Sequence, residues 1–250
     1  MNAIAAPRRF PRAIVDVPRT ARAALAFLGI AAWFATQSLL ASRGFPEGIG
    51  DALHVFLNPL TQWLAHHDLA ANVLLIVTSA MIDGLGCYLL LAGVMGSTVR
   101  PLLGLFLLFG LRQICQALIA LPAPPDMIWR YPGLPSLLVT YETGNDFFFS
   151  GHTAIAVYGA MELWHYPRPW LKLAAVFVAA IEILTVLILR AHYSMDVFTA
   201  ILAAYSVSSV AARLAPLCDG RLARSFRPLL LQYLGGSSDD SRNHKTIGLC

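Results

Sequence analysis

The sequence predicts an all-α membrane protein with six transmembrane helices and both termini in the cytoplasm. The 250-residue chain is 57% apolar and only 13% charged, whereas a soluble domain is nearer half apolar and a quarter charged. Six apolar stretches are each long enough for a helix to cross about 30 Å of hydrocarbon, which takes roughly 20 residues. These apolar runs are continuous, which fits helices and not the alternating strands of a membrane barrel.

The predicted spans follow one another along the chain. We place them near residues 23–41, 70–95, 101–120, 148–166, 170–189 and 195–212. The apolar segment 55–65 is shorter and contains Pro59, so we expect an interfacial or loop segment there. The membrane domain therefore covers residues 23–213, between a basic N-terminus (1–22) and a tail (214–250) whose polar end is expected to be disordered.

The basic residues predict the orientation of the chain. Of the 18 Lys and Arg residues, all but Arg43, Arg112, Arg130 and Arg190 lie in the two termini, between spans two and three, or between spans four and five. Basic residues collect on the cytoplasmic side of membrane proteins, so both termini are expected there. The first apolar run is longer than that of a signal peptide, and we expect it to remain as a helix.

Cysteine and charge patterns exclude several kinds of protein. The four cysteines, Cys87, Cys115, Cys218 and Cys250, lie far apart without CxxC spacing or paired histidines nearby. This pattern predicts neither a metal site nor a disulfide framework. The net charge of +4 is not clustered, so no nucleic-acid partner is expected.

Two polar motifs are predicted to meet on the external face. A Phe-Ser-Gly-His-Thr sequence at 149–153 begins span four, and a His-Tyr-Ser-Met-Asp-Val sequence at 192–197 begins span six. Spans four and six run in the same direction across the membrane, so both motifs lie at external helix ends. We therefore expect His152 and His192 to come together.

The residues of these motifs suit phosphate chemistry. His192 and Asp196 are four residues apart, which on a helix puts them within hydrogen-bonding reach. A carboxylate bonded to one ring nitrogen makes the other a better base or nucleophile. Ser150 and Gly151 stand at a helix start, where the backbone N–H groups favour an anion such as phosphate. His152 would then serve as a general acid or base.

These motifs resemble the paired signatures of the sphingomyelin synthase family, the transferase branch of the type-2 phosphatidic acid phosphatase superfamily. Arg112, followed by Leu-Pro at 121–122 and by Pro124, resembles a third motif of that family. Asp146, four residues before Ser150, also matches. The resemblance covers residues 105–215, so the catalytic part of the membrane domain is expected at about 105–213.

The resemblance implies a catalytic triad of His152, His192 and Asp196, with no metal or other cofactor. His192, oriented by Asp196, would attack the phosphorus of a phosphocholine or phosphoethanolamine head group and hold it as a phosphohistidine while diacylglycerol leaves. His152 would protonate the leaving hydroxyl and then deprotonate the acceptor, ceramide or another lipid alcohol. The implied partners are a donor phospholipid, a lipid-alcohol acceptor and the bilayer.

Six residues near the motifs are predicted to bind substrate: Ser150, Gly151, Asp146, Arg112, Arg190 and Tyr193. Arg112 is the most telling, because a guanidinium within the hydrocarbon is costly and is usually functional. Its alternative role is a structural ion pair with Asp83 or Glu182. Ser150 is also a residue type that commonly caps helices.

Two alternative functions are left open, a lipid phosphatase or phospholipase C-like hydrolase of the same superfamily and a non-enzymatic lipid-binding or transport protein. The phosphatase branch carries Lys-x6-Arg-Pro and an arginine six residues before the second histidine. Here Arg100 and Pro101 are present, but Gly93 and Val186 occupy the other two positions.

We expect an integral membrane protein, with a bacterial inner membrane favoured and the site on its external face. A eukaryotic secretory membrane and a homo-oligomer are left open.

Overall fold

The computed structural model describes residues 28, 31, 35, 49–139, 141 and 147–243, with side chains up to Arg221. The chain divides into two units, Met1–Gly50 and Asp51–Cys250. The predicted first span, 23–41, lies outside the described residues except for three helical positions. The described part of the second unit is helical, with α2 (Ala52–Ala65), α3 (Asp68–Met95), α4 (Arg100–Leu118), α5 (Gly151–Leu163), α6 (Pro169–Ile188) and α7 (Ser194–Asn243).

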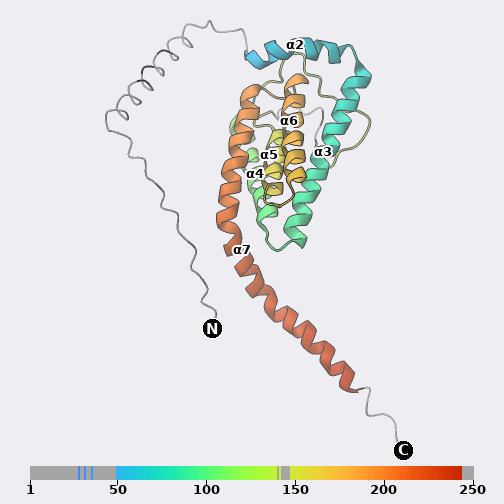
Figure 1. The fold of residues 1–250 in the computed structure, drawn as a ribbon, viewed down its shortest axis with the longest axis vertical. Coiled ribbons are helices and arrows are strands. Elements are labelled where there is room, and N and C mark those ends of the chain that lie inside the picture. The colour runs from blue at the N-terminus through green and yellow to red at the C-terminus, as the bar shows by residue number, and fades with distance from the viewer. Residues whose placement is uncertain are drawn as a thin grey trace, which may run out of the picture. The chain divides into compact units, whose positions relative to one another are not determined.

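Four of these helices are long and apolar enough to cross a membrane: α3, α4, α6 and the part of α7 over Ser194–Arg221. They match the predicted spans two, three, five and six, and they make the chain an integral membrane protein. The backbone of α7 continues beyond this span to Asn243 (Figure 1). The cytoplasmic placement of both termini stays a prediction.

The predicted span 148–166 is shorter in the structure. Helix α5 has 13 residues, which at 1.5 Å per residue is about 20 Å and less than the thickness of the hydrocarbon. Its start is delayed because residues 147–150 are not helical and Ser150 caps the helix. The prediction, which used hydropathy alone, included residues 148–150 in the helix.

The segment 55–65 is helical, so the loop alternative of the prediction is wrong, while the interfacial alternative stays a prediction. Helix α2 begins because the Asp51 carboxylate accepts hydrogen bonds from the N–H groups of Leu53 at 2.9 Å and His54 at 3.2 Å. Pro59 lies inside the helix and removes one backbone hydrogen bond. Packing compensates, since α2 lies across the ends of α3 and α6 (Figure 1) and buries one face, which includes Leu57 and Leu64.

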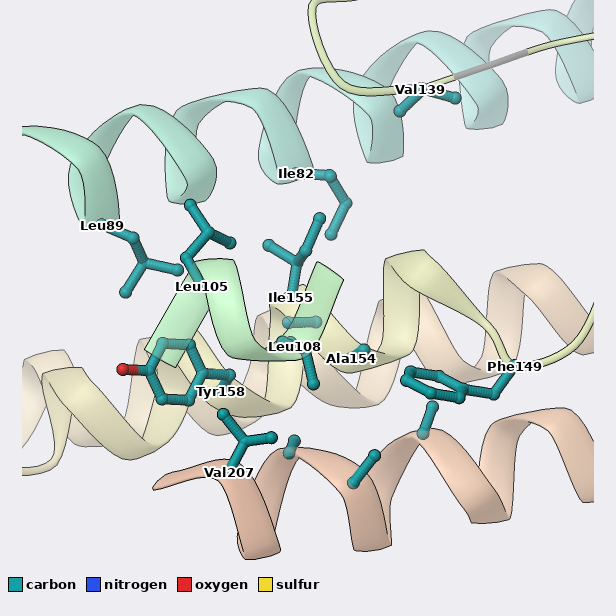
Figure 2. Packing of buried hydrophobic residues seen from close by; sticks show 14 residues of the cluster. Ile82, Leu89, Leu105, Leu108, Val139, Phe149, Ala154, Ile155, Tyr158 and Val207 are labelled. Atoms are coloured by element: carbon teal, nitrogen blue, oxygen red, sulfur yellow. The ribbon is translucent and has the colours of Figure 1, made fainter. Parts of the chain in front are cut away.

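The core of the bundle lies between α3, α4, α5 and α7. Figure 2 shows side chains from all four helices meeting there: Ile82, Leu89, Leu105, Leu108, Ile155, Tyr158 and Val207. Tyr158 passes so close to Gly104 that a Cβ at that position would lie 1.9 Å from the hydroxyl oxygen. The hydroxyl donates to the Arg100 carbonyl at 3.0 Å. This packing holds the first turns of α5 and α7 next to each other, with the Ser150 N–H 3.3 Å from the Asp196 carbonyl oxygen.

The connection between α4 and α5 runs beside α3. Near the start of α3, Arg130 pairs with Asp68 at 2.6 Å. Further along, the Ser136 hydroxyl and the N–H groups of the next two residues donate to the Asp83 carboxylate at 2.9 Å each. Asp83 lies 15 residues beyond Asp68, about 22 Å along the helix. Non-helical backbone at such depth needs hydrogen-bond partners within the protein, and Asp83 supplies them.

We expect Asp83→Ala to lower the free energy of unfolding by about 2–3 kcal/mol, because it leaves three donors without their acceptor. Thermal unfolding in detergent micelles would measure the change. Asp68→Asn is the matched control, since its ion pair with Arg130 is exposed and such pairs contribute about 1 kcal/mol or less. Equal stability of the two variants would show that Asp83 does not anchor the connection.

Candidate functional site

A cavity of about 60 Å³ lies where the two motifs meet. Side chains from α3, α4, α5, the α4–α5 connection and the α6–α7 turn line it: Ile82, Phe109, Arg112, Trp129, Leu138, Phe147, Gly151, His152, Ile155, Ala191 and His192. The structure thus brings His152 and His192 to one cavity, as their positions on two parallel spans predict. Arg112 lies there with them.

His192 is buried in the turn between α6 and α7, and its ring is held by a backbone carbonyl. The Nδ1 atom lies 2.8 Å from the Phe147 oxygen. A carbonyl oxygen only accepts hydrogen bonds, so Nδ1 carries the proton and Nε2 has the free lone pair. The nearest Asp196 oxygen is 3.8 Å from Nδ1. The expected direct hydrogen bond to Asp196 is therefore not formed, because α7 begins only at Ser194 and the helical i, i+4 spacing does not apply to His192.

Asp196 has two roles in the local structure. One of its carboxylate oxygens accepts a hydrogen bond from the Tyr193 N–H at 3.0 Å, as acidic residues in the first turn of a helix often do. This bond closes the start of α7. The same oxygen remains 3.8 Å from the His192 ring, where a buried negative charge stabilises positive charge on the imidazole.

His152 lies in the first turn of α5, with its ring edge-to-face against Trp129 at 5.0 Å between centroids. Ser150 is fully buried and accepts from the Thr153 N–H at 3.4 Å, which makes it the N-cap of α5. Ser150 itself does not line the cavity. The turn that it caps presents His152 to the cavity from a helix N-terminus, which favours negative charge.

Arg112 reaches the same helix N-terminus from α4. Its Nε donates to the Phe149 carbonyl at 2.9 Å. A Cβ at Gly151 would lie 3.2 Å from that Nε, so glycine leaves room for the guanidinium beside the first turn of α5. A guanidinium, a helix N-terminus and His152 together form a positively polarised wall that suits a phosphate group.

Two other residues predicted to bind substrate lie outside the cavity lining. Arg190 donates to the Asp126 carboxylate at 3.0 Å and to the Asn58 side chain at 2.7 Å. The hydroxyl of Tyr193 donates to the Pro122 carbonyl at 3.3 Å. These bonds tie the α6–α7 turn to its neighbours, and a role in substrate binding stays a prediction for both. Asp146 lies outside the described residues.

Sequence reasoning missed two groups at this site. Trp129 packs against His152 from the α4–α5 connection, outside every motif of the sequence, and no sequence signal identifies it. The carbonyl of Phe147 orients His192, and a backbone group has no side-chain signature. Both contacts depend on how the irregular segments fold over the helix ends.

The tautomer of His192 can be measured directly. We expect histidine-selective ¹⁵N NMR to show the proton on Nδ1 at a pH at which the ring is neutral, because that proton is bonded to the Phe147 carbonyl. A His192→Gln variant would assign the signal. A neutral His192 with its proton on Nε2 would contradict the geometry.

Comparison with known proteins supports the interpretation of the second half of the chain. Residues 143–212 match the family described as PAP2 superfamily C-terminal. This segment contains both histidine motifs, α5, α6 and the first part of α7. Comparisons with curated proteins and with solved structures gave no match. Over residues 143–212 this membrane protein is therefore similar to the PAP2 superfamily C-terminal family.

Proposed function

We propose that the protein is a membrane phospholipid head-group transferase that works through a phosphohistidine on His192. The observation that carries this proposal is the geometry of one ring: the proton of His192 is held on Nδ1 by the Phe147 carbonyl, which leaves Nε2 as a nucleophile. Because His192 lines the same cavity as His152 and Arg112, a nucleophile, a proton-transfer group and a cation are available to one phosphate.

The reaction then has two displacements at phosphorus. In the first, Nε2 of His192 forms a bond to the phosphorus of a glycerophospholipid, the bond from phosphorus to the glycerol oxygen breaks, and His152 gives that oxygen a proton. Diacylglycerol leaves. In the second, His152 takes the proton of an acceptor lipid hydroxyl, whose oxygen attacks phosphorus as the nitrogen–phosphorus bond breaks. The proton on His152 and the lone pair on His192 are both restored.

Two charged groups suit the intermediate. When Nε2 bonds to phosphorus the imidazole becomes positive, and the Asp196 carboxylate 3.8 Å away stabilises that charge. Arg112 lies beside the N-terminus of α5, where it favours the developing negative charge on the phosphate oxygens. The ring keeps its Nδ1 proton throughout.

The positions typical of the phosphatase branch support transfer over hydrolysis. Arg100 pairs with Glu162 at 2.7 Å, and it lies 12 residues before Arg112 on α4, about 18 Å along the helix. Val186 is fully buried in an apolar cluster. A Cβ at Gly93 would already lie 2.3 Å from the Leu102 side chain, so no lysine fits there. None of these three positions supplies a cation to the cavity.

The test is lipid mass spectrometry on the purified protein in phosphatidylethanolamine or phosphatidylcholine vesicles, with and without ceramide. We expect diacylglycerol and a sphingolipid that carries the head group to accumulate together over many turnovers only when the acceptor is present; without it, diacylglycerol should not exceed the amount of protein. His192→Ala is expected to lose transfer completely, and His152→Ala to slow it by about 100- to 10,000-fold, the usual contribution of a general acid or base.

His165→Ala is the matched control, because His165 is exposed just beyond the far end of α5 and its ring is bonded to the Met161 carbonyl, away from the cavity. It should retain the rate of the unmodified protein. Diacylglycerol formed without acceptor, together with free phosphorylated head group, would make the protein a hydrolase. Full activity of both alanine variants at His152 and His192 would exclude the mechanism.

A further inference from the structure

Helix α2 presents a polar stripe to the turn that carries His192. The stripe consists of Asp51, His54, Asn58 and Thr61, which follow one another at intervals of three, four and three residues and so lie on one face of the helix. His54 and Thr61 are buried. The helix is otherwise largely apolar, so four polar side chains on its inner face need partners.

Each of the four side chains has a partner in the segment 188–194. At one end, the Thr61 hydroxyl donates to the Ile188 carbonyl at 2.7 Å. Next to it, the Asn58 side-chain oxygen accepts from the Arg190 guanidinium at 2.7 Å. These bonds hold the end of α6 and the first residues of the turn.

The other end of the stripe holds His192 itself. Nε2 of His54 lies 3.0 Å from the His192 carbonyl oxygen, so it donates to it, and the His54 ring stacks on Tyr193 at 5.8 Å between centroids. The Asp51 carboxylate accepts from the Ser194 N–H at 2.6 Å. Burial alone would raise the pKa of Asp51, but the hydrogen bond from Ser194 and the neighbouring His54 bring it below its usual range. Asp51 therefore remains an acceptor at neutral pH.

The polar stripe adds to the backbone bonds of this turn, in which the N–H groups of residues 190–192 donate to the Val186 and Leu187 carbonyls of α6. Residues 190–193 lie between the end of α6 and the start of α7, and Arg190 has a φ of +51°, which costs a non-glycine residue about 1–3 kcal/mol. His54 is the donor to the His192 carbonyl, and the N–H of the same peptide group, on Tyr193, donates to Asp196. Loss of the His54 bond leaves the carbonyl side of this peptide group without its donor.

We propose that His54 is a positioning residue for the reaction of His192, acting through the hydrogen bond from its Nε2 to the His192 carbonyl. The inference rests on the proposed function for its kinetic consequence. His54 does not touch the cavity. It fixes the peptide group of His192, while the Phe147 carbonyl fixes the ring, and both are needed to aim Nε2 at phosphorus.

The test compares His54→Met with His54→Gln. Methionine fills a similar volume without a donor, whereas the glutamine amide places an N–H group near the position of Nε2. We expect the methionine variant to lose about 10- to 100-fold in kcat, the cost of misplacing a reacting group by about 1 Å, with KM little changed. The glutamine variant should restore most of kcat. His66→Gln, on the exposed end of α2, is the matched control.

A second readout does not depend on the reaction. The Nδ1 proton of His192, observed by NMR, should be protected from solvent exchange in the unmodified protein and the glutamine variant, and exposed in the methionine variant. If the unmodified protein transferred no head group, the proposed function would fail and this proton would still report on positioning.

The inference would be overturned in either of two ways. One is a methionine variant with wild-type kcat and a protected Nδ1 proton. The other is a folded glutamine variant that loses as much kcat as methionine, because a donor would then not be what matters. If the methionine variant does not fold, His54→Leu replaces it, because leucine also lacks a donor, and unchanged kcat in that variant would also contradict the proposal.

Discussion

The hydrogen bond from His192 to the Phe147 carbonyl is the interaction on which the site depends. It joins the α6–α7 turn to the residues that precede α5, two segments 45 positions apart in the chain. Its length of 2.8 Å and the acceptor-only carbonyl decide which nitrogen of the ring carries the proton. A ring with its proton on Nε2 would present no lone pair to the cavity. The site would then have no nucleophile for His152 and Arg112 to assist.

The helices make this bond possible because they hold the α4–α5 connection and the α6–α7 turn in place. Packing among α3, α4, α5 and α7 sets the first turns of α5 and α7 side by side. Each irregular segment is then fastened by polar contacts: Asp83 holds the α4–α5 connection against α3, and α2 holds the α6–α7 turn. Groups outside regular helices can point into a cavity that a straight helix face would not reach. Their backbone N–H and C=O groups lack helical partners, and these hydrogen bonds supply partners instead.

The sequence predicts much of this architecture because the apolar hydrocarbon layer determines both the hydropathy and the length of a helix that crosses it. The predicted spans at 70–95, 101–120, 170–189 and 195–212 agree with α3, α4, α6 and the first part of α7. That His152 and His192 come together could also be predicted, because it follows from the direction of the two spans that they begin. Pro59 and the short apolar run at 55–65 indicated an interfacial or loop segment, so helix α2 was not predicted, although the polar spacing from Asp51 to Thr61 is a helical signal.

The finer geometry of the site could not be predicted in the same way. The i, i+4 rule placed His192 against Asp196, but the rule holds only within a helix, and α7 begins two residues after the histidine. Which carbonyl takes the place of the carboxylate depends on how Phe147 is positioned by tertiary packing. The partners of Arg190 are Asn58 in α2 and Asp126 in the α4–α5 connection. The path of that connection could not be predicted, because its sequence has no helical or strand periodicity.

The most direct test of the account is to trap the covalent intermediate. The purified protein would be incubated with phosphatidylcholine or phosphatidylethanolamine and no acceptor, digested at alkaline pH and analysed by mass spectrometry. The account predicts a peptide that carries the phosphorylated head group on His192, with the adduct lost after acid treatment and absent from His192→Ala. Diacylglycerol release without any adduct, or an adduct on another residue, would contradict it.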